Sequence, residues 1–308
     1  MRRLLLRLVF LVSAPGLLTI AAAARAADPQ VHVFTAGNQP AGERRPLLIF
    51  LHGLGGSGAE ALDNPALRAL AEQGRMVMVA PDGTLDHQGR RFWNAGPACC
   101  NFDGKAVNDV ARLEALIAHW LERPEIDPAR VYVVGFSNGG FMAHRLGCFM
   151  DDRLAAVVSI GGAGRAREEA CTPVSPIAVR EVHGDADPIV RYDGGRVFND
   201  RALDPHPSAP QTFHDWAERL GCSGAPKLTT ADLDPRLPGA ETRIESYAGC
   251  PLGAAELWTV HGGGHQVATP ALLARVGEFL AAHPKAAPKK KTAPQKKRER
   301  ERGVKLPY

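Results

Sequence analysis

Short apolar runs alternate with helix-like stretches along most of the chain. Compact β-branched runs are typical of buried strands, and apolar residues at a 3.6-residue period are typical of helices. The strands predicted in this way cover residues 46–51, 76–80, 131–134, 155–160, 177–182 and 256–260. The helices are predicted at about 60–72, 107–121, 141–148, 212–220 and 271–282. This alternation predicts an α/β fold with a mostly parallel central sheet and helices on both faces.

Two long stretches show neither pattern. Residues 84–104 are predicted to form a loop, and residues 222–250 a turn-rich excursion closed by cysteines. Loops of this length in a compact domain are usually functional or held by disulfides.

The two ends of the chain differ from the region between them. Residues 1–26 have a charged start, an apolar middle and a small-residue end, which predicts a cleaved export signal, with a retained membrane anchor as the alternative. Residues 285–308 are rich in Lys, Arg, Pro and Ala, which predicts a disordered basic tail. One folded domain is therefore expected at 27–284, in a protein secreted to the periplasm or the medium.

The net charge of +4 comes from these two ends, and the region between them is net negative. A nucleic-acid partner is therefore not expected. No segment after the signal is apolar for long enough to suggest a stable membrane span. The basic tail is expected to be simply solvated, and weak association with anionic surfaces is the alternative.

An even number of cysteines in an exported protein predicts disulfides. Cys222 and Cys250 flank the excursion and are expected to pair with each other. Cys99 and Cys100 are adjacent, so Cys148 and Cys171 are expected to be their partners. None of the six has the paired spacing of a zinc site, and no metal is expected.

The most informative segment is the run Val131–Val134 followed by Gly-Phe-Ser-Asn-Gly. A serine on a sharp turn between a strand and a helix projects its hydroxyl from the top of the sheet, as in the nucleophile elbow of serine hydrolases. Gly135 and Gly139 allow that tight turn, and the helix directs backbone amides toward the reacting oxygen. The pattern predicts Ser137 as a nucleophile.

A serine nucleophile needs a histidine base and a carboxylate that orients the base. In this type of sheet the expected order is serine, acid and histidine, each on a loop after a strand. Asp187 and His265 meet this condition, with Asp185 and His261 as the alternatives nearer the strand ends. The remaining candidates are predicted to support loops or cap elements, and they are His52, His144 and His183.

The oxyanion of an acyl-transfer reaction needs two backbone donors. The amide of Asn138 follows the nucleophile and is predicted to be one of them. The glycine-rich turn after the strand 46–51 is predicted to supply the other, from Leu54 or alternatively from Gly55.

Five motifs together resemble secreted esterases of the polyhydroxybutyrate depolymerase and feruloyl esterase group, over roughly residues 45–283. They are HGLGGS (52–57), WNAGPACC (93–100), GFSNGGFMAHRL around Ser137, HGDADPIVRYDGG (183–195) and GGGH (262–265). The resemblance implies an α/β-hydrolase fold, no cofactor and a triad of Ser137, Asp187 and His265. It also implies that Trp93 and Asn94 lie near the substrate entrance. Many members carry Thr-Trp-Pro after the catalytic histidine, where this chain has Gln-Val-Ala at 266–268.

The expected function is that of a secreted serine carboxylesterase that forms an acyl-serine intermediate. Short 3-hydroxyalkanoate esters or oligomers are the first expected substrates, with feruloyl or acetyl esters of plant cell-wall polysaccharide as the alternative. Two further classes are a serine peptidase and a non-catalytic binding protein on the same fold.

Overall fold

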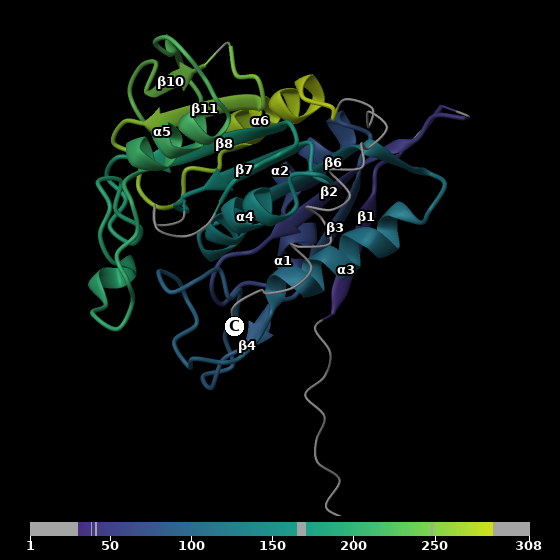
Figure 1. Ribbon diagram of the computed structural model, residues 1–308, viewed down its shortest axis with the longest axis horizontal. Helices are drawn as coiled ribbons and strands as arrows, with labels where there is room; N and C mark the ends of the chain where they lie inside the picture. The colour runs from purple at the N-terminus through teal and green to yellow at the C-terminus, as the bar shows by residue number, and fades with distance from the viewer. Residues whose placement is uncertain (1–29, 38, 41, 165–170, 248, 286–308) are drawn as a thin grey trace, which may run out of the picture.

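The computed structural model describes residues 30–285 apart from positions 38, 41, 165–170 and 248. A nine-stranded sheet in the order β1-β3-β2-β6-β7-β8-β11-β10-β9 crosses the molecule (Figure 1). The six central strands are parallel, whereas β1 at one edge and β10 and β9 at the other are antiparallel to their neighbours. The predicted fold class is confirmed. The strands are β1 (Val31–Thr35), β2 (Arg45–Leu51), β3 (Val77–Pro81), β6 (Ile126–Phe136), β7 (Ala156–Ile160), β8 (Ile177–Gly184), β9 (Lys227–Ala231), β10 (Thr242–Ser246) and β11 (Gly253–Val260).

Helices cover both faces of this sheet (Figure 1). One face packs against α3 (Asp109–Leu121), α4 (Asn138–Phe149) and α5 (Ala209–Arg219). The other packs against α1 (Gly58–Asp63), α2 (Pro65–Gln73) and α6 (Pro270–Ala282). The central strands are therefore buried on both sides, which explains their continuous apolar runs.

The helix predicted at about 60–72 is in fact two helices, α1 and α2. Asn64 separates them, and its side chain accepts hydrogen bonds from the amides of Ala66 and Leu67 at 2.9 and 3.3 Å. Pro65 occupies the first position of α2, where its missing amide costs nothing. The apolar pattern is thus continuous, but an N-cap residue followed by a proline starts a second helix within it.

The predicted excursion at 222–250 contains two strands, β9 and β10, that extend the sheet. Four of the five residues of β9 are exposed, so this edge strand lacks the apolar signal of the buried strands. The same reason explains why β1, whose valines face solvent, gave no signal. The predicted loop at 84–104 contains a short hairpin, β4 (Thr84–Leu85) and β5 (Arg91–Phe92), and a 3-10 turn, η1 (Val197–Asn199), follows β8.

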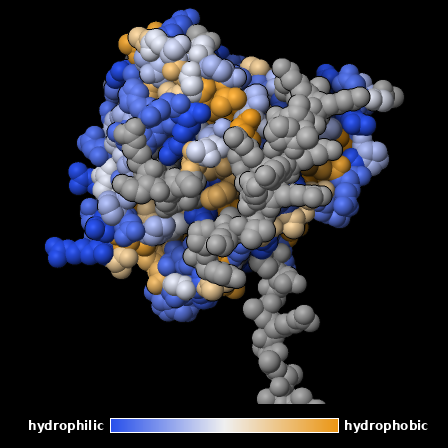
Figure 2. Space-filling view, viewed as in Figure 1, coloured by the Kyte–Doolittle hydropathy of each residue, from blue (hydrophilic) through white to orange (hydrophobic). Residues whose placement is uncertain are grey.

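The visible face of the molecule is mostly hydrophilic, with small and scattered hydrophobic areas (Figure 2). Such scattered apolar side chains are normal on a folded surface. None of the helices within the described ranges is long and apolar enough to cross a bilayer. The predicted signal peptide and all of the predicted tail beyond Lys285 lie outside the described residues.

Three disulfides are present in the described part of the chain, and the expected Cys222–Cys250 pair is confirmed. The expectation for the other four cysteines was wrong. Cys148 at the end of α4 bonds Cys171, with 5.0 Å between their Cα atoms, and Cys99 bonds its neighbour Cys100. The peptide bond between Cys99 and Cys100 is cis, a geometry that the expectation of separate partners did not consider.

We expect the Cys222–Cys250 disulfide to stabilise the β9–β10 edge of the sheet. Its two cysteines lie 28 positions apart in the sequence, so the disulfide closes a long loop. Replacing both cysteines by serine should lower the free energy of unfolding by about 2–4 kcal/mol, because the unfolded chain gains freedom. Urea unfolding of the double variant measures this, and a change below about 0.5 kcal/mol would contradict it.

Candidate active site

Ser137 lies on a sharp turn between β6 and α4. Its φ of 54° and ψ of −119° are unusual for a residue with a side chain, and such strain is found at functional sites. Its amide donates to the carbonyl of Ile160 on β7 at 2.8 Å, which holds the turn at the carboxyl edge of the sheet. The predicted elbow therefore has the expected backbone geometry.

Gly139 allows this turn to pack directly on the end of β2. A Cβ atom at position 139 would lie 2.0 Å from the carbonyl oxygen of Leu51, which no side chain can accommodate. The glycine-rich turn after β2 also contacts the serine, since a Cβ at Gly53 would lie 3.3 Å from the Cβ of Ser137. The predicted nucleophile and the predicted oxyanion turn are thus neighbours.

The structure brings the three predicted triad residues into one hydrogen-bonded chain. His265 Nε2 lies 2.9 Å from Ser137 Oγ, and His265 Nδ1 lies 2.6 Å from Asp187 Oδ2. With the proton on Nδ1 directed at the carboxylate, Nε2 can accept the serine proton. The Asp187 side chain is fully buried, while that of His265 is 14% exposed.

Backbone donors on its own loop also hold the Asp187 carboxylate. The amides of Ile189 and Val190 donate to its Oδ1 at 2.8 and 3.0 Å. Burial alone would raise the pKa of Asp187, but hydrogen bonds from His183 and His265 hold the pKa well below its usual range. The acid is therefore ionised at neutral pH.

The alternative candidates Asp185 and His261 pair with each other instead of with Ser137. Asp185 Oδ2 lies 2.8 Å from His261 Nδ1, and Asp185 Oδ1 accepts from the amide of Gly262 at 2.7 Å. The loops after β8 and β11 also touch at Gly184, where a Cβ would lie 2.1 Å from the carbonyl oxygen of Gly263. This second pair joins the acid loop to the histidine loop.

The turn after β2 presents the amide of Leu54 in a defined direction. His52 Nδ1 lies 2.7 Å from the carbonyl oxygen of Gly53, and the carbonyl belongs to the same planar peptide unit as the Leu54 amide. Burial lowers the pKa of His52, so the ring is neutral and its Nε2 accepts from the Gly83 amide at 2.9 Å. Its predicted supporting role is thus visible in these contacts.

Among the described residues, the amides of Leu54 and Asn138 are free to donate to a bound oxyanion, whereas the amide of the alternative, Gly55, is not. The Gly55 amide already donates to the carbonyl of Arg91 at 2.8 Å. Within the described part of the chain, the amides of Leu54 and Asn138 have no hydrogen-bond acceptor. Their contribution to an oxyanion hole is a prediction that this availability supports.

Trp93 lies beneath the elbow and has no exposed surface. Its backbone amide donates to Asn138 Oδ1 at 2.7 Å, its carbonyl accepts from Asn138 Nδ2 at 3.0 Å, and its indole donates to the His52 carbonyl at 2.9 Å. Trp93 therefore connects the elbow, through its backbone, to the turn after β2, through its ring, and the ring does not face solvent. Asn94 is half-buried, with its side chain donating to the Val107 carbonyl at 2.9 Å. Substrate contact by either residue stays a prediction.

Sequence reasoning missed the buried carboxylate of Glu181 on β8. It contacts His144 and His183, two of the histidines that were predicted to support loops. A glutamate inside the apolar run of residues 177–182 was the available signal, because a buried charge needs a partner. Among the described residues, no group of three or more metal-binding side chains is arranged to hold an ion.

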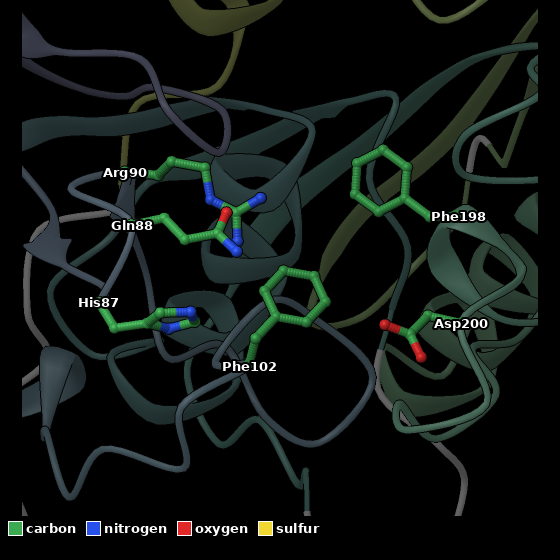
Figure 3. A pocket seen from close by; sticks show the side chains of 6 residues that line it. All are labelled: His87, Gln88, Arg90, Phe102, Phe198 and Asp200. Atoms are coloured by element: carbon green, nitrogen blue, oxygen red, sulfur yellow. The ribbon is translucent and has the colours of Figure 1, made fainter.

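An open pocket of about 370 Å³ lies between the β4–β5 hairpin and η1. Figure 3 shows the hairpin residues on one side, Phe198 and Asp200 on the other, and the ring of Phe102 between them. The hairpin is bonded to the oxyanion turn through Arg91, and the Phe198 amide donates to the Ile189 carbonyl at 3.0 Å. One wall of the pocket is therefore hydrogen-bonded to the turn after β2, and the other to the loop that carries Asp187. The lining residues are His87, Gln88, Arg90, Phe102, Phe198 and Asp200.

Residues 35–205 match the model of a family described as phospholipase/carboxylesterase, and this match covers more than half of the chain. The chain belongs to this family of α/β-hydrolases. Its similarity to feruloyl esterase B of Piromyces equi is 30% identity over 231 residues, which covers 71% of this chain and 39% of the relative. A putative esterase, NocK, of Nocardia uniformis subsp. tsuyamanensis is 30% identical over 230 residues, which covers 72% of this chain and 65% of the relative. The chain therefore spans less than two thirds of the length of either relative.

Solved structures of the α/β-hydrolase fold agree with this family at the level of the fold. An acetyl xylan esterase from Aspergillus awamori superposes with a TM-score of 0.59 at 14% identity, covering 82% of this chain and 93% of that one. A carboxylesterase from Bacillus cereus gives a TM-score of 0.53 at 14% identity, covering 83% and 95%. The feruloyl esterase part of the expected resemblance is confirmed by the relatives, and the depolymerase part stays a prediction.

We expect the Asn138 side chain to be essential for holding the elbow on Trp93. Asn138→Ala removes its two hydrogen bonds to Trp93, which leaves the buried Trp93 amide without a partner and the Trp93 carbonyl with the Ala95 amide alone. The free energy of unfolding should fall by about 2–4 kcal/mol. Urea unfolding measures this loss, and a variant as stable as the wild type would show that the clamp is dispensable.

Proposed function

We propose that this member of the family is a serine carboxylesterase with Ser137, Asp187 and His265 as its catalytic triad. The observation that carries the proposal is the unbroken hydrogen-bonded chain from Asp187 Oδ2 through His265 to Ser137 Oγ. A peptidase is less well supported, since the named relatives are esterases. A non-catalytic binding protein would have no need for this geometry.

In the proposed reaction His265 Nε2 takes the proton of Ser137 as its Oγ attacks the ester carbonyl. The amides of Leu54 and Asn138 donate to the oxyanion of the tetrahedral intermediate. Its collapse releases the alcohol, which receives the proton from His265, and leaves an acyl-serine. Water then attacks the acyl group with His265 again as base, so that the acid leaves and Ser137 regains its proton. Asp187 stays ionised throughout and stabilises the imidazolium.

For the substrate we favour feruloyl or acetyl esters of plant cell-wall polysaccharide. Feruloyl esterase B of Piromyces equi supports this class by its similarity to the chain. The rings of Phe102 and Phe198 support it further, because aromatic side chains stack on aromatic acyl groups. They supply an aromatic surface that is missing at residues 266–268, where this chain has Gln-Val-Ala in place of Thr-Trp-Pro.

Short 3-hydroxyalkanoate esters or oligomers are the second candidate. The five motifs support them as well, because together they resemble the combined polyhydroxybutyrate depolymerase and feruloyl esterase group. Methyl ferulate, acetylated xylan and 3-hydroxybutyrate oligomers distinguish the two classes in one panel. Cleavage of the oligomers alone would make 3-hydroxyalkanoate esters the favoured class.

We propose export as well, because three disulfides suit an oxidising compartment outside the cytoplasm. The residues of the predicted signal are outside the described part of the chain. Weak binding of the basic tail to anionic surfaces is likewise a proposal from charge alone.

A fluorophosphonate that reacts with activated serines tests the proposed nucleophile. We expect the wild type to be labelled and Ser137→Ala to resist labelling, with ester hydrolysis reduced by at least about 10³-fold. His119→Gln is the control, because His119 is exposed on α3 and its ring contacts Trp120 and no triad residue. Labelling of Ser137→Ala, or no labelling of the wild type, would refute the proposal.

A substitution of Phe198 tests the proposed aromatic contact with the substrate. Phe198→Ala should raise KM for methyl ferulate about two- to tenfold, which corresponds to loss of about 0.5–1.5 kcal/mol of stacking, and leave KM for methyl acetate unchanged. Leu85→Ala is the control, since Leu85 is 49% exposed and Phe198 48%, but Leu85 does not line the pocket. Equal effects on both esters would remove Phe198 from the substrate site.

A further inference from the structure

A chain of buried polar side chains continues from Asp187 into the core. The Glu181 carboxylate is fully buried, with Oε2 at 2.7 Å from His144 Nε2 and Oε1 at 3.0 Å from His183 Nδ1. The other ring nitrogen of His183, Nε2, lies 2.7 Å from the Val190 carbonyl oxygen and 3.4 Å from Asp187 Oδ2. Two carboxylates therefore flank one histidine below the triad.

The hydrogen-bond partners determine the protonation of His144. Its Nδ1 accepts from the indole of Trp216 at 2.9 Å, so this nitrogen carries no proton. The proton must then be on Nε2, which donates to Glu181. His144 is thus neutral and does not balance the charge of Glu181.

The hydrogen-bond partners of His183 constrain its protonation in the same way. The Val190 carbonyl can only accept, so Nε2 carries a proton. The contact between Nδ1 and Glu181 then needs one more proton, on the imidazole or on the carboxyl group. The imidazole is the stronger base, and the Asp187 carboxylate at 3.4 Å further favours the cation.

We propose that His183 is a positioning residue of the active site, a buried imidazolium that Glu181 keeps charged and that holds the Asp187 carboxylate in place against His265. It acts on Asp187 directly by charge. It also acts through Val190, whose carbonyl accepts from His183 and whose amide donates to Asp187. This inference rests on the proposed function, because it assigns the role through the proposed triad.

The ionisation of these groups agrees with that geometry. Burial alone would lower the pKa of His183, but hydrogen bonds to Asp187 and Glu181 outweigh burial and raise its pKa to about 10. Burial would raise the pKa of Glu181, but hydrogen bonds from His144 and His183 lower it. The remaining titratable neighbours are His206, whose pKa burial lowers, and the Tyr192 ring, whose centroid is 5.9 Å from that of His183. Neither can replace His183 as the cation at neutral pH.

The pH dependence of fluorophosphonate labelling tests the proposal without a known substrate. Protonation of His265 stops it from accepting the serine proton, which produces the acid limb of the profile. A nearby imidazolium opposes that protonation, so its loss should move the acid limb to higher pH by about 1 pH unit. Glu181→Gln keeps the size of the side chain and lets His183 become neutral, and His183→Gln removes the ring itself.

We expect His183→Gln to show this shift and Glu181→Gln a smaller shift in the same direction, because Glu181→Gln removes a negative charge as well. Both variants should lose up to about 10²-fold in labelling rate at neutral pH, because Asp187 is less well held. His283→Gln is the control, since His283 is half-buried at the end of α6 and contacts Phe279 and no residue of this cluster. Its acid limb should stay at the wild-type pH. A wild type that is not labelled would refute the proposed function, which is a separate outcome.

An unmoved acid limb in Glu181→Gln and His183→Gln, whatever the rate, would reduce His183 to a structural role and overturn the proposal. If neither variant folds, neutron diffraction from wild-type crystals at pH 8 decides the matter. Deuterium on both ring nitrogens of His183 is the expected result. Deuterium on only one of them would overturn the proposal.

Discussion

The proposed active site depends on a direct backbone contact between the elbow and the end of β2. At Gly139 the first turn of α4 lies so close to the Leu51 carbonyl that a Cβ would be 2.0 Å away. That contact places Ser137 beside the turn at Gly53, where a Cβ would lie 3.3 Å from the Cβ of Ser137. Backbone packing thus positions the proposed nucleophile beside the turn that carries the proposed Leu54 donor.

A similar contact sets the other half of the site. The loops after β8 and β11 meet at Gly184 and Gly263, and the Asp185–His261 pair holds them together at the surface. Parallel pairing of β8 with β11 aligns the carboxyl ends of both strands, so Asp187 and His265 extend from the same edge. Beneath them, Glu181 and His183 place a compensated pair of charges in the core, where an unpaired charge would be costly.

The sequence predicts the parts of this architecture that depend on local signals. The order of Ser137, Asp187 and His265 was accessible because each follows an apolar run that forms a buried parallel strand. The edge strand β9 could not be predicted from the sequence, because its residues are largely exposed and show no apolar period. The Cys99–Cys100 disulfide was missed because the expectation assumed that adjacent cysteines do not pair. Partners of buried charges, such as His183 for Glu181, depend on contacts across loops and strands and leave only a weak trace in sequence.

The crystal structure of the phosphonate adduct tests the central claim most directly, since the adduct mimics the tetrahedral intermediate at the serine. The account predicts phosphorus bonded to Ser137 Oγ, with one phosphonyl oxygen about 2.7–3.1 Å from the amides of both Leu54 and Asn138. His265 should remain hydrogen-bonded to Asp187. An adduct on another residue, or a phosphonyl oxygen directed away from these two amides, would contradict it.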